Sequence, residues 1–353
     1  MKKQTRTNII RFSYIGATIV VLILIASFNE DFDSIPTVLS QLNIFWLFAT
    51  FACLVLYWLT DGWLLGDITS YMSPSQRLSY AKSLKIGLIG LYYGALTPSS
   101  TGGQPAQVIY MNREKIPVGV GTCIVLVKFI AYSLTVIVYY LISMAFMGDY
   151  YYQNYIGIYW FSLLGFIINA LAIALVVLSI VKKDWMIKAA NGIIAFLHRI
   201  KIMKQPEKAQ ENIAKTIEEY SAAGKYITQH KRRSVGSFFI SMANIGFLFA
   251  ITYCIYRAFG LDDSTFMTLM MLQSLLYTAV AYFPLPGAAG ASESGFYVIF
   301  STFFSKGLVV AAMILWRIMT YYIILAVGSL IVVFDELAIM RRQKKAAAQI
   351  TEE

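Results

Sequence analysis

Four ionisable side chains fall inside otherwise apolar stretches of the sequence: Asp61, Lys128, Glu293 and Arg317. An ionised group in the hydrocarbon core of a membrane costs about 3 kcal/mol on insertion scales unless it is paired or hydrated. Two interpretations remain open. In the first, the two acids and the two bases neutralise each other inside a helix bundle. In the second, Lys128 and Arg317 bind an anion such as a phosphate, Arg317 bidentately and Lys128 as a point charge, while Glu293 balances a cationic group or carries a proton and Asp61 is a charge partner.

Two polar interruptions could form a site around these charges. The string TPSSTGGQP follows thirteen largely apolar residues, which as a helix would reach only about 20 Å into a core roughly 30 Å thick. Its prolines and glycines end a helix, and irregular backbone at that depth needs protein or water around it. The string FPLPGAAGASESG repeats the theme near the other end of the chain. We expect substrate-binding residues in both strings: Thr97, Pro98, Ser99, Ser100, Gly102, Gly103, Gln104, Pro284, Pro286, Gly287, Gly290 and Glu293.

The sequence offers few residues for nucleotide binding, catalysis or metal binding. The interruption at residues 97–105 lacks the GK[ST] of a nucleotide-binding P-loop. Both histidines, His198 and His230, lie in a basic loop, and the three cysteines show no metal-ligand spacing. We therefore expect no catalytic residue, no metal ion and no cofactor.

The whole chain has the composition of a polytopic membrane protein. It has 353 residues, of which 58% are hydrophobic, and its mean hydropathy is +0.63. The sequence predicts an all-α fold in which two broken units, Leu84–Met111 and Phe266–Phe304, interrupt a series of full spans. The six full spans are expected at Ile9–Phe28, Ile44–Gly66, Val118–Met147, Tyr155–Val181, Gly236–Phe259 and Gly307–Phe334.

Charge sets the expected topology, because Lys and Arg gather on the cytoplasmic side. If both broken units are re-entrant hairpins, the basic N-terminus, Arg113, the loop 182–235 and the basic C-terminus all lie in the cytoplasm, and Asp149 lies outside. The first hairpin then dips in from the cytoplasmic face and the second from the outer face. We expect a membrane domain over residues 1–340, with an amphipathic cytoplasmic insert at 182–235, and a basic cytoplasmic tail at 341–353. Within the insert, residues 191–203 combine an apolar face with His198, Arg199 and Lys201, which predicts an interfacial helix.

The two halves also show weak internal similarity. Gln104 and Glu293 lie 189 residues apart, as do Lys128 and Arg317, and Pro98 and Pro286 lie 188 apart. An inverted repeat with its site near the membrane midplane predicts such correspondences.

At the level of motifs, ALTPSSTGGQPAQ followed by PLPGAAGASESG resembles the lysylphosphatidylglycerol synthase transmembrane region, the flippase-like membrane half of multiple peptide resistance factor. This resemblance implies two re-entrant hairpins around a lipid-headgroup cavity and movement of a modified phospholipid between leaflets. In that family a soluble aminoacyl-transferase domain follows the membrane part. These 353 residues lack it, so we expect no phosphatidylglycerol lysyltransferase activity.

The leading hypothesis is translocation of an anionic or aminoacylated phospholipid, of the phosphatidylglycerol type, between leaflets of a bacterial plasma membrane. The alternatives are a lysyltransferase-associated protein in cationic-peptide resistance, a flippase for a lipid-linked sugar, and a secondary transporter for a small anion. The expected partners are the phospholipid and the bilayer, with a homodimer left open and no nucleic acid.

Overall fold

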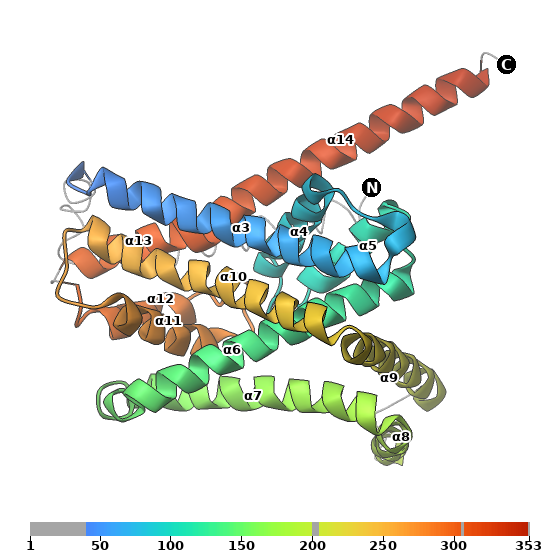
Figure 1. Cartoon of the computed structure of the whole chain (residues 1–353), viewed down its shortest axis with the longest axis horizontal. Helices are drawn as coiled ribbons and strands as arrows, with labels where there is room; N and C mark the ends of the chain where they lie inside the picture. The colour runs from blue at the N-terminus through green and yellow to red at the C-terminus, as the bar shows by residue number, and fades with distance from the viewer. Residues whose placement is uncertain (1–39, 200–204, 305–306, 352–353) are drawn as a thin grey trace.

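We describe a computed structural model of the chain, covering residues 40–199, 205–304 and 307–351. Over these ranges the regular structure is helical, apart from one isolated β-bridge. Figure 1 shows long helices running side by side, with shorter helices packed among them. The long helices are α3 (Ile44–Met72), α6 (Val118–Asn154), α7 (Ile156–Val181), α10 (Lys231–Ala258) and α14 (Ile323–Thr351), the last of which follows α13 (Leu308–Arg317) and a π-helical turn (Ile318–Tyr322).

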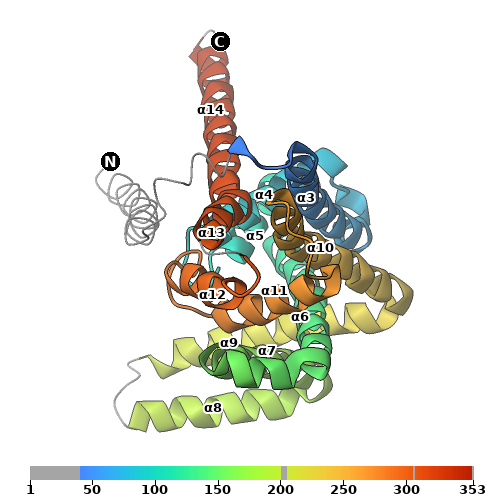
Figure 2. The same cartoon turned by 90° about the vertical axis from the view of Figure 1, so that its left-hand side faces the viewer.

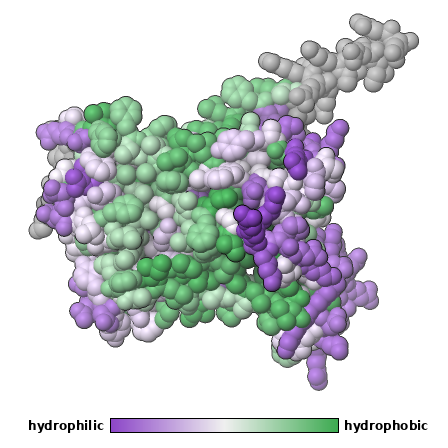
Figure 3. Space-filling model, in the orientation of Figure 1, coloured by the Kyte–Doolittle hydropathy of each residue, from purple (hydrophilic) through white to green (hydrophobic). Residues whose placement is uncertain are grey.

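Five helical stretches of the described chain are long and apolar enough to cross a membrane. Four coincide with helices α3, α6, α7 and α10, and the fifth runs over Leu308–Ala338. Figure 3 shows a hydrophobic band across the middle of the molecule, with hydrophilic residues gathered at its two ends. The expected span at Ile9–Phe28 lies outside the described residues. A multi-pass membrane protein is therefore supported, while six spans and cytoplasmic termini stay predictions.

Both broken units fold as helical hairpins. In the first, α4 (Tyr80–Ala95) packs along α5 (Gly103–Arg113), so the chain turns back at the polar tip. In the second, α11 (Phe266–Val280) packs along α12 (Ala291–Phe300). In Figure 1 the hairpins occupy opposite ends of the bundle. Their membrane sidedness remains a prediction from charge.

The polar insert forms two amphipathic helices. The sequence suggested an interfacial helix from residue 191 to 203, but α8 already begins at Lys183 and is described to Arg199. It leaves Trp185, Ile193 and Phe196 exposed, as a helix lying on a membrane surface would. Next comes α9 (Pro206–Gln229), which packs against α6 and α7.

The C-terminal residues from 341 to 351 are helical. They continue α14, which projects from the bundle on the side opposite α8 (Figures 1 and 2). A short 3-10 turn, η2 (Pro74–Gln76), links α3 to the first hairpin.

Each hairpin belongs to its own buried cluster of apolar side chains. One cluster gathers Ile86 and Ile89 of α4 with Met111 of α5 and residues of α3 and α6. The other gathers residues of α11, α12 and α13 with part of α10, including Phe296 and Phe300. The hairpins are therefore held from behind by separate cores, and their tips face the space between those cores.

Candidate binding cavity between the two hairpin tips

The two tips touch each other. Pro98 and Pro286 form an isolated antiparallel β-bridge, although 188 residues separate them. The Ser99 hydroxyl donates to the carbonyl of Tyr282 at 3.3 Å. The Tyr321 hydroxyl, just beyond α13, donates to the carbonyl of Ala95 at 3.2 Å. The similarity between the two halves in the sequence thus corresponds to direct contact in space.

Both tips hold residues with left-handed backbone. Ser99 and Ser100 have φ of 48° and 56°, and in the second tip Gly287 and Ala288 have φ of 59° and 49°. For a residue with a Cβ this conformation costs about 1–2 kcal/mol. Such cost persists where the surrounding structure over-determines the backbone, which is common at ligand clamps.

A cavity of about 430 Å³ lies beside the tips, within the range of small-molecule sites, roughly 300–1,000 Å³. Eight of the sequence-predicted residues line it: Asp61, Ser99, Ser100, Gly103, Gln104, Lys128, Gly287 and Arg317. The others shape the tips without reaching the cavity wall: Thr97, Pro98, Gly102, Pro284, Pro286, Gly290 and Glu293.

Lys128, in the first third of α6, pairs with Asp61 of α3. Its ammonium lies 2.7 Å from one carboxylate oxygen and 2.8 Å from the other. A glycine in α4 makes room for this carboxylate, because a Cβ at Gly87 would lie 2.6 Å from Asp61 Oδ2. Both side chains are nearly buried, with 13% and 9% of their surface exposed. The pair therefore ties two long helices together at the wall of the cavity.

Arg317, the last residue of α13, pairs with Glu293 of α12. Its Nε lies 2.7 Å from Glu293 Oε1, although the N–H does not point along that contact. One terminal nitrogen donates to the carbonyl of Gly287 at 3.0 Å. The other carboxylate oxygen of Glu293 accepts from the backbone N–H of Gly290 at 2.7 Å. Glu293 therefore holds both the cation and the turn of its own hairpin.

These two pairs agree with the interpretation that the acids and bases neutralise each other inside the helix bundle. The two bases of the cavity each face an acid, so the four groups sum to no net charge. An anion entering the cavity must compete with a carboxylate for each cation, or share the cation with it. The site suits a ligand whose own binding energy compensates for loosening a buried ion pair, which by itself would be costly.

Most of the carboxamide side chains that line the cavity were not predicted from the sequence. Five carboxamides line it: Gln104, Gln107, Asn169, Asn244 and Gln273. Only Gln104 was predicted, from the first tip. The carboxamides of α7, α10 and α11 could have been noticed because each lies within an apolar span. A polar group inside a membrane helix is costly unless it makes a contact there.

One edge of the cavity is a seam between α4 and α14, which run antiparallel. Near the cavity, Tyr321 reaches Ala95. Further along, Gly328 packs so tightly on α4 that a Cβ there would lie 2.4 Å from Tyr92 Cβ. At the polar end, Lys85 pairs with Asp335. The seam thus leads from the cavity to the end of the molecule where the first hairpin begins.

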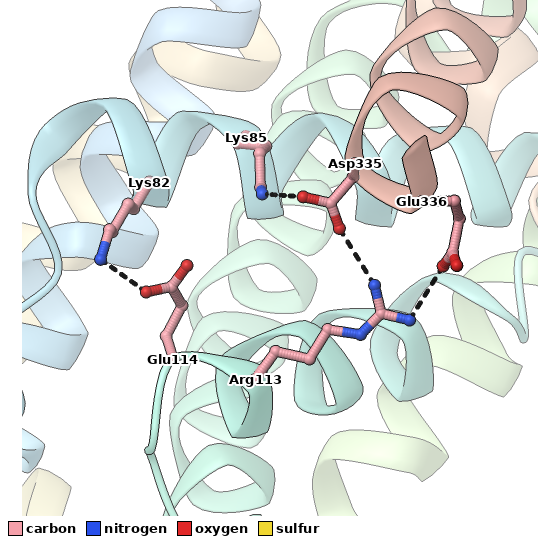
Figure 4. A network of polar contacts seen from close by, with 6 residues as sticks. All are labelled: Lys82, Lys85, Arg113, Glu114, Asp335 and Glu336. Carbon is pink, nitrogen blue, oxygen red and sulfur yellow. Dashed lines mark hydrogen bonds and ion pairs between the residues drawn. The ribbon is translucent and has the colours of Figure 1, made fainter. Parts of the chain in front are cut away.

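An ion network closes the polar end of this seam (Figure 4). Asp335 of α14 lies between Lys85 of α4 and Arg113 of α5, with 3.0 Å from Arg113 Nη1 to Asp335 Oδ2. Arg113 also contacts Glu336 at 3.1 Å and lies 4.3 Å from the centre of the Tyr110 ring. Both arms of the first hairpin are therefore fastened to a helix of the second half.

The fold and the cavity define a class of protein: a multi-pass membrane protein in which paired helical hairpins meet at an internal polar site. Within that class, the chain belongs to the family described as the lysylphosphatidylglycerol synthase TM region, whose sequence model matches residues 13–328. The resemblance carried by the two tip motifs is thereby confirmed.

A relative from an archaeon extends over most of the chain. A protein named "UPF0104 membrane protein" from Archaeoglobus fulgidus is 23% identical over 310 residues, which is 86% of this chain and 90% of the relative. The match extends over most of both chains and overlaps the region that the family model covers. It supports a membrane location, while a bacterial plasma membrane stays a prediction.

Proposed function

We propose that this protein moves an anionic phospholipid of the phosphatidylglycerol type from one leaflet of its membrane to the other. The observation that carries the proposal is the cavity of about 430 Å³ inside an apolar bundle, whose wall includes Asp61, Lys128 and Arg317, three members of two buried acid–base pairs. A phospholipid brings a phosphate that can replace a carboxylate at Lys128 or Arg317, and acyl chains that stay in the lipid. Family membership adds a relation to lysylphosphatidylglycerol handling.

The seam between α4 and α14 is the proposed route for the headgroup. A headgroup can enter from the side only where two helices separate, while the acyl chains remain outside. The ion network around Asp335 joins α4 and α5 to α14 at the polar end of this seam, and the two tips contact each other beside the cavity. Rocking of one half against the other then opens the cavity to alternate leaflets.

The test is a leaflet-exposure assay with purified protein in vesicles that contain fluorescent phosphatidylglycerol. The variant is the double substitution Lys128→Gln with Asp61→Asn, which keeps hydrogen-bonding groups but removes both charges without leaving one unpaired. We expect translocation to fall at least tenfold, since the phosphate loses a cationic partner. The matched control is Lys183→Gln with Glu218→Gln, an exposed pair between α8 and α9.

Unchanged translocation in the cavity variant, with the control also active, would remove this charge pair from the mechanism. Uptake of sulfate or inorganic phosphate by the same vesicles, without lipid movement, would favour the small-anion carrier. Lysylated lipid appearing when charged tRNA is added would favour a role in lipid synthesis.

A further inference from the structure

The cavity has a polar wall that the charged pairs do not explain. Asn169 comes from α7, Asn244 from α10 and Gln273 from α11, so three separate helices each present a carboxamide to the same space. A carboxamide has both donor and acceptor capacity but no charge. Its N–H groups can donate to an anion, but its oxygen pairs only with a donor, so the whole group matches a hydroxyl, which also donates and accepts.

Two buried polar atoms of residues in the cavity wall have no hydrogen-bond partner among the residues that the structure describes. Asn244 donates to the carbonyl of Tyr57 at 2.6 Å, and Gln273 accepts from Thr252 at 2.8 Å. By contrast, Asn169 is only 5% exposed, and within the described residues its side-chain oxygen has no hydrogen-bond partner. The indole N–H of Trp316, 6% exposed, is likewise unpartnered there.

Both unpartnered atoms belong to residues of the cavity wall. One is an acceptor and the other a donor, and they come from different helices, α7 and α13. Buried polar atoms are nearly always paired in folded proteins, so an exception calls for an explanation. Each atom has almost no accessible surface, so a ligand hydroxyl can pair with it only once the Asn169 amide or the Trp316 indole turns toward the cavity.

Aromatic rings form much of the remaining wall. Tyr57 and Trp58 come from α3, Phe129 and Tyr132 from α6, and Tyr277 from α11. The hydroxyls of Tyr132 and Tyr277 are hydrogen-bonded to each other. Flat apolar faces beside a few oriented polar groups are typical of sites that take a compact ligand with a defined orientation.

We propose that the cavity selects its lipid by the hydroxyl groups of an uncharged polyol or sugar attached to the phosphate. In this arrangement the phosphate binds beside Lys128 and Arg317. The hydroxyl groups form hydrogen bonds with Asn169, Gln273 and Trp316. The inference rests on the proposed lipid translocation and adds the chemistry of the headgroup. It assigns binding to α7 and α11, outside both tips.

The experiment compares lipids that differ in hydroxyl groups alone. Vesicles carry phosphatidylglycerol or phosphatidylpropanol, which have the same acyl chains, the same phosphodiester charge and nearly the same size. Phosphatidylinositol, with a ring polyol, is the third probe. We expect wild-type protein to move the two hydroxylated lipids at least tenfold faster than phosphatidylpropanol, because a site built to hydrogen-bond hydroxyls rejects an analogue that lacks them.

The variant Asn169→Leu tests the residue assignment. Leucine has similar volume and removes an unpartnered polar group, so we expect no fall in melting temperature and a severalfold fall in the ratio of phosphatidylglycerol to phosphatidylpropanol rates. Trp316→Phe should lower the same ratio. The control is Ser274→Ala, which removes another buried unpartnered hydroxyl on α11 that does not line the cavity; its ratio should match wild type.

The outcomes separate the two proposals. Equal rates for phosphatidylglycerol and phosphatidylpropanol would overturn hydroxyl selection and leave lipid translocation standing. Movement of none of the lipids would overturn the translocation on which it rests. A wild-type ratio in both Asn169→Leu and Trp316→Phe would overturn the assignment of these residues.

Discussion

The two hairpins share a plan and differ in how their charges are held. Each consists of an approach helix, a tip with left-handed residues and a short return helix, and each is followed by a helix that carries a cation, Lys128 or Arg317. The acids differ in origin. Asp61 reaches Lys128 from α3, which precedes its hairpin, whereas Glu293 lies within the second hairpin and also binds the backbone of Gly290.

The helices behind the cations differ as well. Lys128 lies inside α6, an uninterrupted helix of 37 residues. Arg317 ends α13, a helix of 10 residues, and a π-helical turn of five residues follows it directly. Insertions of this kind are frequent at functional sites. In the second half the cation, its acid and the tip therefore form one local unit, while in the first half the pair joins two independent helices.

This difference suggests a division of work. The pair in the second hairpin supports the fold of its own tip, so it should resist separation. The pair in the first half can separate when α3 and α6 move apart, with no turn depending on it. The first hairpin is in turn fastened to α14 by an exposed network that can open.

The largest expected effect comes from breaking the second pair. Glu293→Gln leaves the buried Arg317 without a charge partner, and removing one member of a buried pair costs about 3–5 kcal/mol. Asp61→Asn should cost less, because the Lys128 side chain is more exposed than that of Arg317, 13% against 6%. Thermal unfolding of the two variants in detergent measures the difference.

A double variant tests whether the unpaired charge of Arg317 causes the loss of stability. Glu293→Gln with Arg317→Gln removes both charges and should recover most of the lost stability, since no unpaired charge remains. Equal destabilisation by Glu293→Gln and Asp61→Asn would mean that the two pairs do the same structural work, and the proposed division would fail.

An intermediate effect is expected at the seam. Asp335→Asn removes the carboxylate between Lys85 and Arg113, and partly exposed pairs of this kind contribute about 1 kcal/mol or less each to stability. The fold should therefore survive while α4 and α14 separate more often. A cysteine placed at Gly94, a buried residue of the cavity wall on α4 with room for a Cβ, should react faster with a membrane-impermeant maleimide in a chain whose three native cysteines are replaced.

The comparison variant for the seam is Lys82→Gln. Its pair with Glu114 lies within the first hairpin and does not involve α14, so labelling of the cysteine at position 94 should stay at the background rate. Faster labelling in Lys82→Gln as well would show that the hairpin loosens as a whole, and the seam would lose its assigned role.

The sequence predicts best those features that depend on residues close together in the chain. Spans and broken units are continuous in the chain, so apolar length and the prolines at 98 and 286 located α3, α6, α7, α10 and both hairpins. The contact between the tips could have been predicted from the internal repeat, because equivalent positions of inverted halves meet near their shared axis.

Other features depend on distant helices. Nothing near Asn169 in the sequence indicates that it faces the same space as Trp316, 147 residues later. The start of α8 at Lys183 was missed because charged residues interrupt its apolar face in the sequence, although they lie on the other side of the helix. The second tip places an alanine, Ala288, in left-handed backbone, a conformation that usually takes glycine and that the sequence therefore does not indicate.

That alanine gives the smallest and most local comparison. In the second tip Ala288 has φ of 49°, while Ala289 beside it is not among the residues with positive φ. Left-handed backbone costs a residue with a Cβ about 1–2 kcal/mol, and glycine in place of alanine costs about 0.5–1 kcal/mol in chain entropy. Ala288→Gly should therefore raise stability by up to about 1 kcal/mol, whereas Ala289→Gly should lower it by about 0.5–1 kcal/mol. Thermal unfolding in detergent compares the two directly, and because the substitutions are chemically identical, opposite signs can come only from the backbone. Equal losses at both positions would mean that the second tip relaxes without strain, and that left-handed alanine is no part of what holds it against Pro98.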